Sequence, residues 1–449
     1  MEEGRSITVL QDEWYKKIIK KGKTIMKRKL ALLLSLSMVA SAFSGLAVNA
    51  EEEEITLRIM SSIQTEDEAE LESAMAEAYM EANPNVKIEF ISVANNDLDA
   101  QITTLAASND LPDAFYMNCA FMSTALDMGI VVDANDYISE EFKADVSQQV
   151  FDYCSVNDTL MFIPWFQVPV ALIYRADWFE QTGLESIETM DDFRTVAQKF
   201  AEISGNYGFS MVGTRNGSGE ARFSVYAKAF GVDEVWKNEN GTWESDLTSD
   251  NFKEALQSFV DLDLVDGVVP AGASETAYQD AVTYFANEQT GMIISGSNAV
   301  GAILNRNPEL AGKLGSVTMP AATTEEGRHV TNLQVSGYTI TTACEHPEVM
   351  ADFLEFMANY DNAVSFGSAT GRIPVTNSAL ADEAFSGQEY TGFIDCAEYS
   401  VPYSTFPAYA EVQDIFGEAY NSMLTGVSLD DAMNQLEGRI TNLLAEYNG

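Results

Sequence analysis

The chain has 449 residues, of which 46% are hydrophobic and 10% aromatic, and its 69 acidic and 25 basic residues give a net charge of −44 at pH 7. That length and hydrophobic content suffice for one large core or two ordinary ones. The charge excludes a nucleic-acid partner and an anionic membrane surface, because binding a polyanion requires concentrated Lys and Arg.

The first fifty residues differ from the rest in composition. A basic run from Lys16 to Lys29 precedes nineteen uncharged residues, Leu30 to Val48, and small residues lead up to Glu51. Basic, apolar and small-residue regions in that order are typical of a secretory signal, so we expect residues 1–50 to form an export segment cleaved after Ala50. Retention as a membrane anchor stays open, because nineteen residues approach the length of a membrane span.

A strand, a helix and a second strand follow the export segment. Residues 55–60, ITLRIM, are β-rich, and Thr65 with Glu68 three residues later forms a capping box for a helix that ends near Pro84. The run VKIEFISV, from Val86, alternates apolar and polar residues as a half-buried strand does. This order predicts a βαβ unit.

Residues 162–185, FIPWFQVPVALIYRADWFEQTGLE, are too broken for a membrane helix and too aromatic at their start for an ordinary strand. We interpret them as a strand that crosses between two lobes beside a ligand. Alternating strands and helices elsewhere predict parallel sheets covered on both faces. Further strands are predicted in 111–118, 171–174, 208–212, 291–301 (ending in a Gly-Ser turn) and 332–341 (a pair or one bent strand), and a hairpin turn is predicted at 236–241. Helices are predicted at 98–108, 191–203, 248–263, 281–286, 347–360 and from 412 onward. Ser428 is expected to cap the last helix.

The sequence carries no recognisable pattern for catalysis or metal binding. His329 and His346 lack partners at zinc-ligand spacing, and the aspartates of 261–269 lack the spacing of a calcium loop. Paired carboxylates could hydrolyse glycosides, but so many acidic residues produce such pairs by chance. We therefore expect no enzyme, no cofactor and no metal. We also expect free thiols, although an exported protein could pair its cysteines, Cys119, Cys154, Cys344 and Cys396.

Eight segments stand in a recognisable order: ITLRIM, AEAYMEANPNVKIEF, LPDAFYMN, PWFQVPVALIYRADWFEQTGLESIETMDDF, YFANEQTGMIISGSN, SGYTITTACEHPEVMADFLEFM, GRIPVTNSAL and SLDDAMNQLEGRITNLL. In this order the chain resembles the extracellular solute-binding proteins of carbohydrate ABC transporters, the class that includes maltose-binding protein. The resemblance covers nearly all of residues 55–445. Leu172 to Leu184 matches the family's LYYNKDLFEKAGL pattern, with Arg175-Ala176 in place of Asn-Lys.

The resemblance implies an α/β, two-lobe periplasmic-binding-protein fold of type II, with the lobes joined by crossing hinge strands. It places residues 51–165 and about 335–372 in the N-lobe. Residues from about 166 to 334 and 373–449 then form the C-lobe.

The same resemblance implies a sugar site between the lobes. Sugars present apolar C–H faces and hydroxyl groups, so their sites combine aromatic rings with short polar groups. The family's GxW turn reads Gly296-Ser297-Asn298 here, so one aromatic platform is missing and a polar contact from Asn298 is the alternative. The candidate ligand contacts are Trp165, Gln167, Asn118, Ser62, Gln64, Asn298, Tyr403, Phe406, Tyr409, Glu220 and Arg222.

We therefore expect an exported, non-catalytic, monomeric receptor, periplasmic or on the cell surface, that closes over a carbohydrate and delivers it to ABC transporter permease subunits. An oligosaccharide is the favoured ligand, and Trp165→Ala is expected to weaken its binding without unfolding the protein. The same fold could instead bind a polyamine or an acidic sugar, the latter through Arg222 or Arg215. An enzyme acting on polysaccharide and a glycan adhesin are the alternatives of another class. No lipid-attachment cysteine lies in the export segment, which favours a free periplasmic protein or one held by an uncleaved segment.

Overall fold

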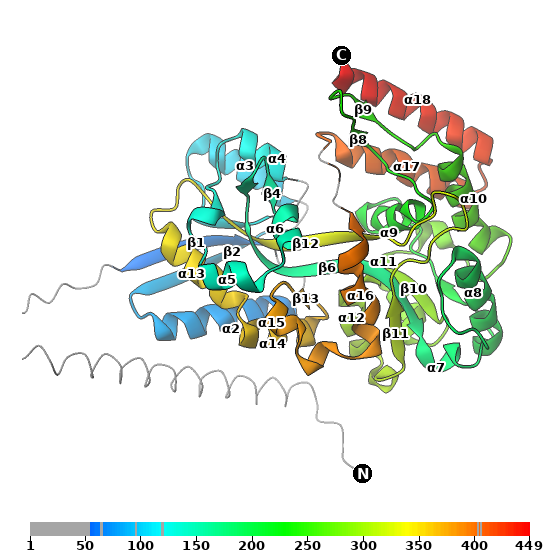
Figure 1. Ribbon diagram of the computed structural model, residues 1–449, viewed down its shortest axis with the longest axis horizontal. Helices are drawn as coiled ribbons and strands as arrows, with labels where there is room; N and C mark the ends of the chain where they lie inside the picture. The colour runs from blue at the N-terminus through cyan, green and yellow to red at the C-terminus, as the bar shows by residue number, and fades with distance from the viewer. Residues whose placement is uncertain (1–53, 63–65, 95–96, 118–120, 402–403, 405) are drawn as a thin grey trace, which may run out of the picture.

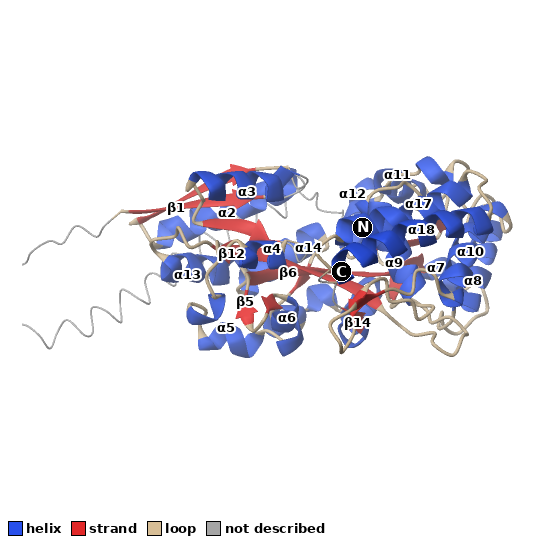
Figure 2. Cartoon of the chain, turned by 90° about the horizontal axis from the view of Figure 1, so that it is seen from above, coloured by secondary structure: helices blue, strands red, loops and turns tan. Residues whose placement is uncertain are grey.

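The computed structural model describes residues 54–449 apart from 63–65, 95–96, 118–120, 402–403 and 405. Two lobes lie side by side and are connected by two long strands, β6 (Ile163–Arg175) and β12 (Thr331–Ile340) (Figure 1). The view from above shows the same two strands passing from one lobe into the other (Figure 2). This architecture confirms the two-lobe α/β fold with crossing strands that the sequence predicts.

The first lobe begins with the predicted βαβ unit. Strands β1 and β2 pair in parallel, from Ile55 opposite Val86 to Ser61 opposite Ser92, and β3 pairs in parallel on the other side of β1. The elements of this lobe are β1 (Ile55–Ser61), α2 (Glu66–Ala82), β2 (Val86–Ser92), α3 (Leu98–Ser108), β3 (Ala114–Met117), α4 (Met122–Asp127), α5 (Glu140–Asp145), α6 (Gln148–Tyr153), β4 (Ser155–Val156), β5 (Thr159–Leu160), α13 (Pro347–Met357) and α14 (Tyr360–Thr370).

The second lobe places helices on both faces of a smaller sheet formed by β6, β10, β7 and β11. Its elements are α7 (Ala176–Phe179), α8 (Met190–Ser204), β7 (Phe209–Ser210), α9 (Gly217–Lys228), β8 (Trp236–Lys237), β9 (Trp243–Glu244), α10 (Asp250–Leu264), α11 (Tyr278–Ala286), β10 (Met292–Gly296), α12 (Asn298–Arg306), β11 (Leu314–Val317), α16 (Gln388–Tyr399), β14 (Ser400–Val401), α17 (Tyr409–Leu424) and α18 (Leu429–Asn448). The short elements β13 (Ile373–Pro374) and α15 (Asn377–Leu380) follow α14 near the crossing strands.

The crossing strands join the two sheets into one, in the order β2-β1-β3-β12-β6-β10-β7. Pairing is parallel between β1 and both β2 and β3, and between β7 and β10, as expected. The prediction of parallel sheets is otherwise wrong, because β12 runs antiparallel to β3 and β6, and β6 runs antiparallel to β10, β11 and β13. The register between β6 and β12 moves from Ser336 opposite Phe166 to Gly337 opposite Pro164. Trp165 is therefore the additional residue of a β-bulge, a feature that re-aims side chains in strands.

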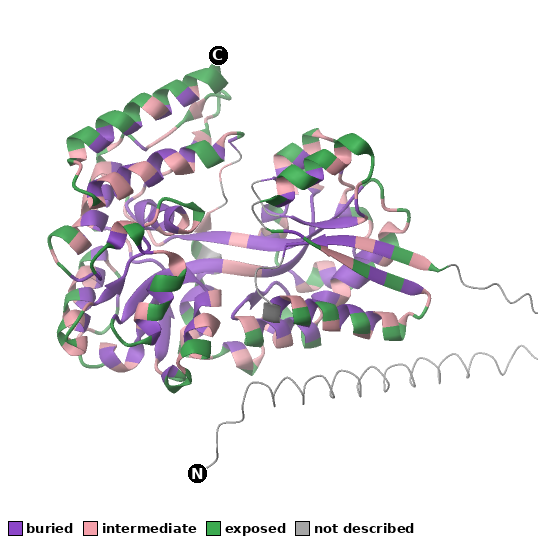
Figure 3. Cartoon of the chain, turned by 180° about the vertical axis from the view of Figure 1, so that it is seen from behind, coloured by how far each residue is buried: buried purple, intermediate pink, exposed green. Residues whose placement is uncertain are grey.

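Each lobe has its own apolar core. One cluster of buried side chains lies between the first-lobe sheet and helices such as α2 and α13, and it includes Phe115, Trp165 and Phe353. Two further clusters cover the two faces of the second-lobe sheet. In Figure 3 the crossing strands are largely buried, and exposed residues lie on the outer faces of the helices. The residue boundaries between the lobes stay a prediction.

Several elements differ from the sequence-based expectation. The residues after Gly296 form helix α12 rather than a simple turn, because Ala299, Val300 and Ile303 recur at helical spacing and are buried. The helix expected at 347–360 is α13, which ends at Met357. Asn359 then caps a further helix, α14, that was not predicted, by accepting a hydrogen bond from the Asn362 amide. The strand expected at 208–212 is limited to β7, and residues 332–341 form one bent strand.

The sequence also predicts two helix caps and the state of the cysteines. Ser428 accepts a hydrogen bond from the Asp431 amide and caps α18 as predicted. The capping box that begins at Thr65 falls outside the described residues. Among the cysteines that the structure describes, Cys344 and Cys396 are free, and Cys119 falls outside the described residues.

Candidate functional site

Trp165 belongs to an aromatic cluster where β6 leaves the first lobe. Its ring centroid lies 4.4 Å from that of Phe366, 5.0 Å from that of Phe166 and 6.0 Å from that of Tyr338. The side chain is only 3% exposed, and its Nε1–H has no hydrogen-bond acceptor among the described residues. Because the indole fills core space, Trp165→Ala is now expected to lower stability as well as any ligand affinity.

Gln167, two residues further along β6, is half-buried. Its Nε2 donates a hydrogen bond to the Pro374 carbonyl oxygen at 2.9 Å, and its backbone lies opposite Val335 on β12 and Ile373 on β13. The side chain therefore fastens the segment after α14 to the crossing strand.

A buried carboxyl group lies at the carboxyl end of β1. Glu72 on α2 accepts hydrogen bonds from Ser61 Oγ at 2.8 Å and from the Tyr338 hydroxyl. Burial raises the pKa of Glu72 to about 7, although both hydrogen bonds act in the opposite direction. Ser62, the next residue after β1, is also buried. The carboxyl group of Glu72 therefore changes charge near neutral pH.

Arg372 connects the first lobe with the start of α12. Its guanidinium donates to Glu68 Oε1 from Nε at 2.9 Å and from Nη2 at 2.6 Å, and lies 4.6 Å from the centre of the Phe166 ring. The preceding Gly371 has φ of +74°, and a Cβ there would lie 2.8 Å from the Ser297 carbonyl oxygen. Glycine is thus required for the backbone before Arg372 to pack against the second lobe.

On the second-lobe side, four residues from four elements form what we call the arginine cluster: Arg222, Tyr278, Ser295 and Asn298. Arg222 donates from Nη2 to Ser295 Oγ at 2.9 Å, and its guanidinium lies 4.7 Å from the centre of the Tyr278 ring. Asn298 Nδ2 donates to the Tyr278 hydroxyl at 3.3 Å. The structure thus brings together two predicted contacts, Arg222 and Asn298, that are distant in sequence.

Glu220, Phe406 and Tyr409 lie in the interior of the second lobe. Glu220 packs between α9 and α17, where burial, and secondarily the charge of Asp414, raises its pKa to about 7. The Phe406 ring lies 5.0 Å from Trp243, and the Tyr409 hydroxyl donates to Glu234. Packing accounts for their burial without a ligand, and their role as ligand contacts stays a prediction.

Three other predicted contacts, Gln64, Asn118 and Tyr403, lie outside the described residues. In sequence, Gln64 follows the carboxyl end of β1 and Asn118 follows that of β3. Their contacts likewise stay a prediction.

The sequence profile described as bacterial extracellular solute-binding protein matches residues 62–364. The chain belongs to this family. The match includes β2, β3, both crossing strands and the arginine cluster of this solute-binding protein, whereas β1, Phe366 and Arg372 lie outside it.

Two curated relatives of this solute-binding protein are distant. Lipoprotein LipO of Bacillus subtilis is 24% identical over 250 residues, which cover 52% of this chain and 49% of the relative. The mannitol-binding protein of Pseudomonas aeruginosa is 22% identical over 263 residues, which cover 56% of this chain and 58% of the relative. The chain thus matches about half the length of these relatives.

Solved structures resemble this solute-binding protein over a greater length. The maltose-bound MalE3 of T. maritima is 21% identical, with a TM-score of 0.75, and the likeness covers 87% of this chain and 100% of that one. The maltotriose-bound protein of Thermus thermophilus is 20% identical, with a TM-score of 0.70, and the likeness covers 86% of this chain and 100% of that one. The Thermotoga lettingae solute-binding protein with α-D-tagatose is 18% identical, with a TM-score of 0.72, and the likeness covers 87% of this chain and 100% of that one. At these identities the likeness establishes the fold.

Sequence reasoning did not single out Arg372, Tyr278 or Glu72, and it considered Glu68 only as part of a capping box. A signal for the pair exists, because both glutamates lie within a turn of Leu71 on the apolar face of α2, where acidic side chains are rarely buried without partners. Arg372 stood inside the segment GRIPVTNSAL, which contributed to the family resemblance. Only the fold shows that Tyr278 meets Arg222.

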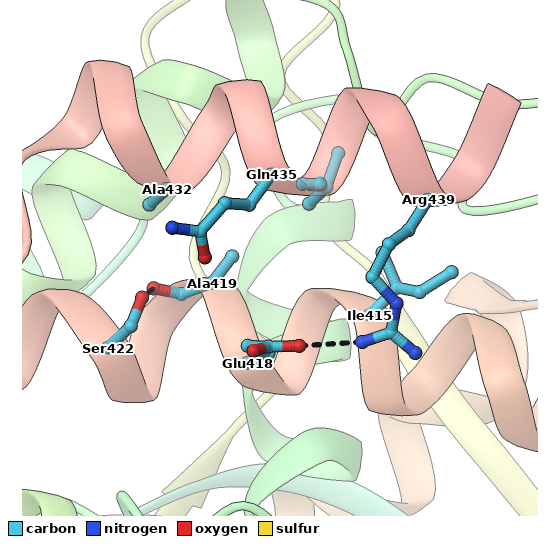
Figure 4. Close-up of a pocket in the computed structure, with 8 residues that line it drawn as sticks. Ile415, Glu418, Ala419, Ser422, Ala432, Gln435 and Arg439 are labelled. Carbon is cyan, nitrogen blue, oxygen red and sulfur yellow. Dashed lines mark hydrogen bonds and ion pairs between the residues drawn. The ribbon is translucent and has the colours of Figure 1, made fainter.

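Two hollows in the described part of this solute-binding protein lie away from these clusters. One, of about 390 Å³, is lined by residues of α8 and α10 such as Arg194 and Gln257. The other, of about 10 Å³, lies between α17 and α18, where Arg439 donates to Glu418 at 2.6 Å (Figure 4). We regard the smaller one as a packing gap between helices.

Two negative findings apply to the described residues. They contain no group of three or more His, Cys, Asp or Glu side chains placed to hold a metal ion. Within the same residues, no helix has both the length and the apolar character needed to cross a membrane.

Proposed function

We propose that this solute-binding protein captures a carbohydrate between its two lobes and delivers it to ABC transporter permease subunits. An oligosaccharide is the favoured ligand. The observation that carries the proposal is that the aromatic cluster around Trp165 lies where β6 leaves the first lobe, while the arginine cluster around Arg222 belongs to the second lobe. Aromatic rings suit the C–H faces of a sugar, and hydrogen-bonding side chains suit its hydroxyl groups.

The relatives agree with a sugar or sugar alcohol as cargo. The solved structures above are described as binding maltose, maltotriose and α-D-tagatose, and one curated relative as binding mannitol. The Trp165 Nε1–H and the Asn298 side chain are the polar groups that we assign to hydroxyl contacts. Ser62, Gln167 and Arg222 are the further candidates, with Gln64, Asn118 and Tyr403 in the segments that the structure does not describe.

Closure of the lobes would follow from bending of β6 and β12. We place the N-lobe at residues 51–165 and about 335–372, and the C-lobe at about 166–334 and 373–449. A ligand that contacts both lobes favours the closed state by its difference in affinity for the two states. No step in this account requires catalysis, and the proposal includes a monomeric, exported protein in the periplasm or on the cell surface.

Equilibrium dialysis against a mixture of neutral and acidic oligosaccharides tests the proposal. Chromatography of the retained material should show an intact oligosaccharide at about one mole per mole of protein. Recovery of shortened sugars would indicate an enzyme acting on polysaccharide. If no sugar is retained, the receptor proposal is wrong.

A further inference from the structure

We propose that Glu72 is a positioning residue for ligand binding: it fastens the end of β1 to the crossing strand β12 only while it carries a proton, so ligand affinity falls as the pH rises through neutrality. The inference rests on the proposed function, because it concerns the regulation of the same site. Three observations carry it: a ring of contacts between three polar side chains, the lack of a cation on Glu72 among the described residues, and the position of the ring between two parts of the candidate site.

Glu72 of α2, Ser61 of β1 and Tyr338 of β12 form what we call the Glu72 triad. Ser61 Oγ lies 2.8 Å from Glu72 Oε2 and 2.9 Å from the Tyr338 hydroxyl oxygen, which also contacts Glu72 Oε1. Each hydroxyl group can donate only one hydrogen bond. An ionised Glu72 therefore leaves the three contacts with two protons, and a protonated Glu72 supplies the third. The carboxyl then donates to Tyr338, Tyr338 donates to Ser61 and Ser61 donates back to Glu72.

The surroundings of Glu72 favour the same protonated state. Burial raises its pKa to about 7 against the opposing effect of its two hydrogen bonds, and the charge of Glu68 acts in the same direction as burial. Both hydrogen bonds that Glu72 accepts from described residues come from hydroxyl groups, whereas Arg372 donates to Glu68 instead. A buried carboxylate without a cation is unfavourable, so this carboxyl takes up a proton near neutral pH.

Titratable groups on the elements around α2 have partners of their own. Tyr116 of β3 reaches the triad only through its ring, whose centroid lies 5.8 Å from that of Tyr338. The further pairs are Asp352 of α13 with Tyr79, Glu355 of α13 with Ser139, Tyr360 of α14 with Asp382, Lys87 with Glu89 of β2, and Arg58 of β1 with Asp110. None of these pairs includes a member of the triad, so a change in the charge of Glu72 acts first on Ser61 and Tyr338.

The triad connects two parts of the candidate site. Ser61 is the last residue of β1 and directly precedes Ser62, a candidate ligand contact. Tyr338 lies on the bent strand β12, and its ring centroid is 6.0 Å from that of Trp165. When Glu72 ionises, the contact between Ser61 and Tyr338 loses its proton, and a contact between two acceptor oxygens is unfavourable. The end of β1 then separates from the crossing strand, and Ser62 and Trp165 lose the relative position that the ligand needs.

The size of the effect follows from the fraction of molecules that carry the proton. With a pKa of about 7, Glu72 is protonated in about half of the molecules at pH 7 and in about one-tenth at pH 8. A ligand that binds only the competent fraction has an apparent dissociation constant equal to the intrinsic value divided by that fraction, so binding should be about tenfold weaker at pH 8 than at pH 6. At pH 8, binding should also take up about one proton per molecule, because the complex holds the proton that the free protein has lost.

Equilibrium dialysis of the purified protein at pH 6, 7 and 8, with the same mixture of neutral and acidic oligosaccharides at every pH, tests the inference. The oligosaccharide retained at pH 6 is then titrated by calorimetry at pH 8 in phosphate and in Tris, because the difference in heat between the two buffers counts the protons taken up. We expect about tenfold weaker binding at pH 8 and uptake of about one proton.

Glu72→Gln should bind this sugar equally well at pH 6 and pH 8. Its amide cannot ionise, yet it can donate to Tyr338 and accept from Ser61 as the protonated carboxyl does. Glu437→Gln, on an exposed face of α18, is the control and should keep the pH dependence of the wild type. Glu220→Gln should keep it too, whatever its effect on affinity, since Glu220, whose pKa burial also raises to about 7, lies in the second lobe.

Crystal structures of the wild-type protein at pH 5.5 and pH 8.5 supply a readout if Glu72→Gln does not fold. The 2.9 Å contact between Ser61 Oγ and the Tyr338 hydroxyl should be present at the lower pH and absent at the higher. The same contact at both pH values would overturn the inference.

The binding outcomes separate this inference from the proposed function. Equal wild-type affinity at pH 6 and pH 8 would overturn the inference and leave the receptor function standing. A pH dependence that persists in Glu72→Gln, or that disappears in Glu220→Gln, would assign the proton to another group and overturn it as well. Retention of no sugar at any pH would overturn both.

Discussion

The guanidinium of Arg372 and the carboxylate of Glu68 form a buried ion pair between residues 304 positions apart. The two side chains are 8% and 5% exposed, and both Nε and Nη2 of the arginine donate to one oxygen of Glu68. Since Arg372 directly follows the glycine that packs against Ser297, the pair fixes the connection between α14 and β13 at the lobe junction. It thereby positions Phe166 and the aromatic cluster beside it.

Removal of one partner of this pair should be costly. Arg372→Met leaves Glu68 buried without its cation, and loss of one member of a buried pair typically lowers stability by about 3–5 kcal/mol. Chemical denaturation should show that loss. The double variant Glu68→Gln, Arg372→Met should recover part of it, and a double variant as unstable as the single one would contradict the pairing account.

Glu72 should make stability depend on pH. Its pKa in the folded protein is about 7, above the ordinary value of 4.5, so the folded state binds this proton more tightly than the unfolded state. Stability should therefore fall as the pH rises from about 4.5 to beyond 7, by about 3 kcal/mol from this group. Melting temperatures of Glu72→Gln between pH 4.5 and 8 should vary less than those of the wild type. Glu437→Gln, on an exposed face of α18, is the control and should retain the wild-type slope.

Trp165 should contribute both to stability and to sugar binding. Replacement by alanine removes its contacts with Phe366 and Phe166 and should cost about 3–5 kcal/mol. Trp165→Phe retains a ring but removes Nε1–H, so we expect a small change in melting temperature and about fivefold weaker sugar binding, the size of one hydrogen bond. Trp243→Phe, a partly buried position that packs against the second-lobe core, should leave sugar affinity unchanged. Equal affinities for the Trp165→Phe protein and the wild type would remove Nε1 from the site.

The bend of β12 should require glycine at position 337. A Cβ there would lie 2.0 Å from the Ile163 carbonyl oxygen, which is backbone and cannot move aside without disturbing the β-bulge. Gly337→Ala should therefore lower the melting temperature strongly. Gly438→Ala provides the contrast, because that position in α18 is open and the change should raise helix stability by up to about 1 kcal/mol. A Gly337→Ala protein as stable as the wild type would show that the strand tolerates a different register.

Much of the fold follows from local sequence patterns. The βαβ start, helix α3 and the Ser428 cap were all predicted from apolar spacing and capping residues, and the crossing role of β6 from its aromatic start followed by an apolar strand. Helix α14 was missed, because the predicted helix ended at Tyr360, where the side-chain cap from Asn359 begins a new helix. The apolar pattern alone cannot show whether a helix continues through such a residue or a new helix begins there.

The candidate site was harder to predict than the fold. Trp165 and Gln167 were predicted as contacts because both lie on the crossing strand, two residues apart, and their role as contacts stays a prediction. Arg222 meets Ser295 and Tyr278 only through packing of α9 against the second-lobe sheet, and no sequence spacing encodes that contact. Arg372 is a single charged residue in a short connection, and its role appears only once Glu68 lies beside it.

Thermal unfolding of the purified protein against a panel of neutral oligosaccharides, uronides, polyamines and amino acids tests the central claim most directly. A ligand present at about a hundred times its dissociation constant should stabilise the folded protein by about 2.7 kcal/mol, which is easily detected as a rise in melting temperature. The account predicts such a rise with one class of carbohydrate and none with polyamines or amino acids. A rise confined to polyamines or amino acids, or no rise with any carbohydrate, would contradict it.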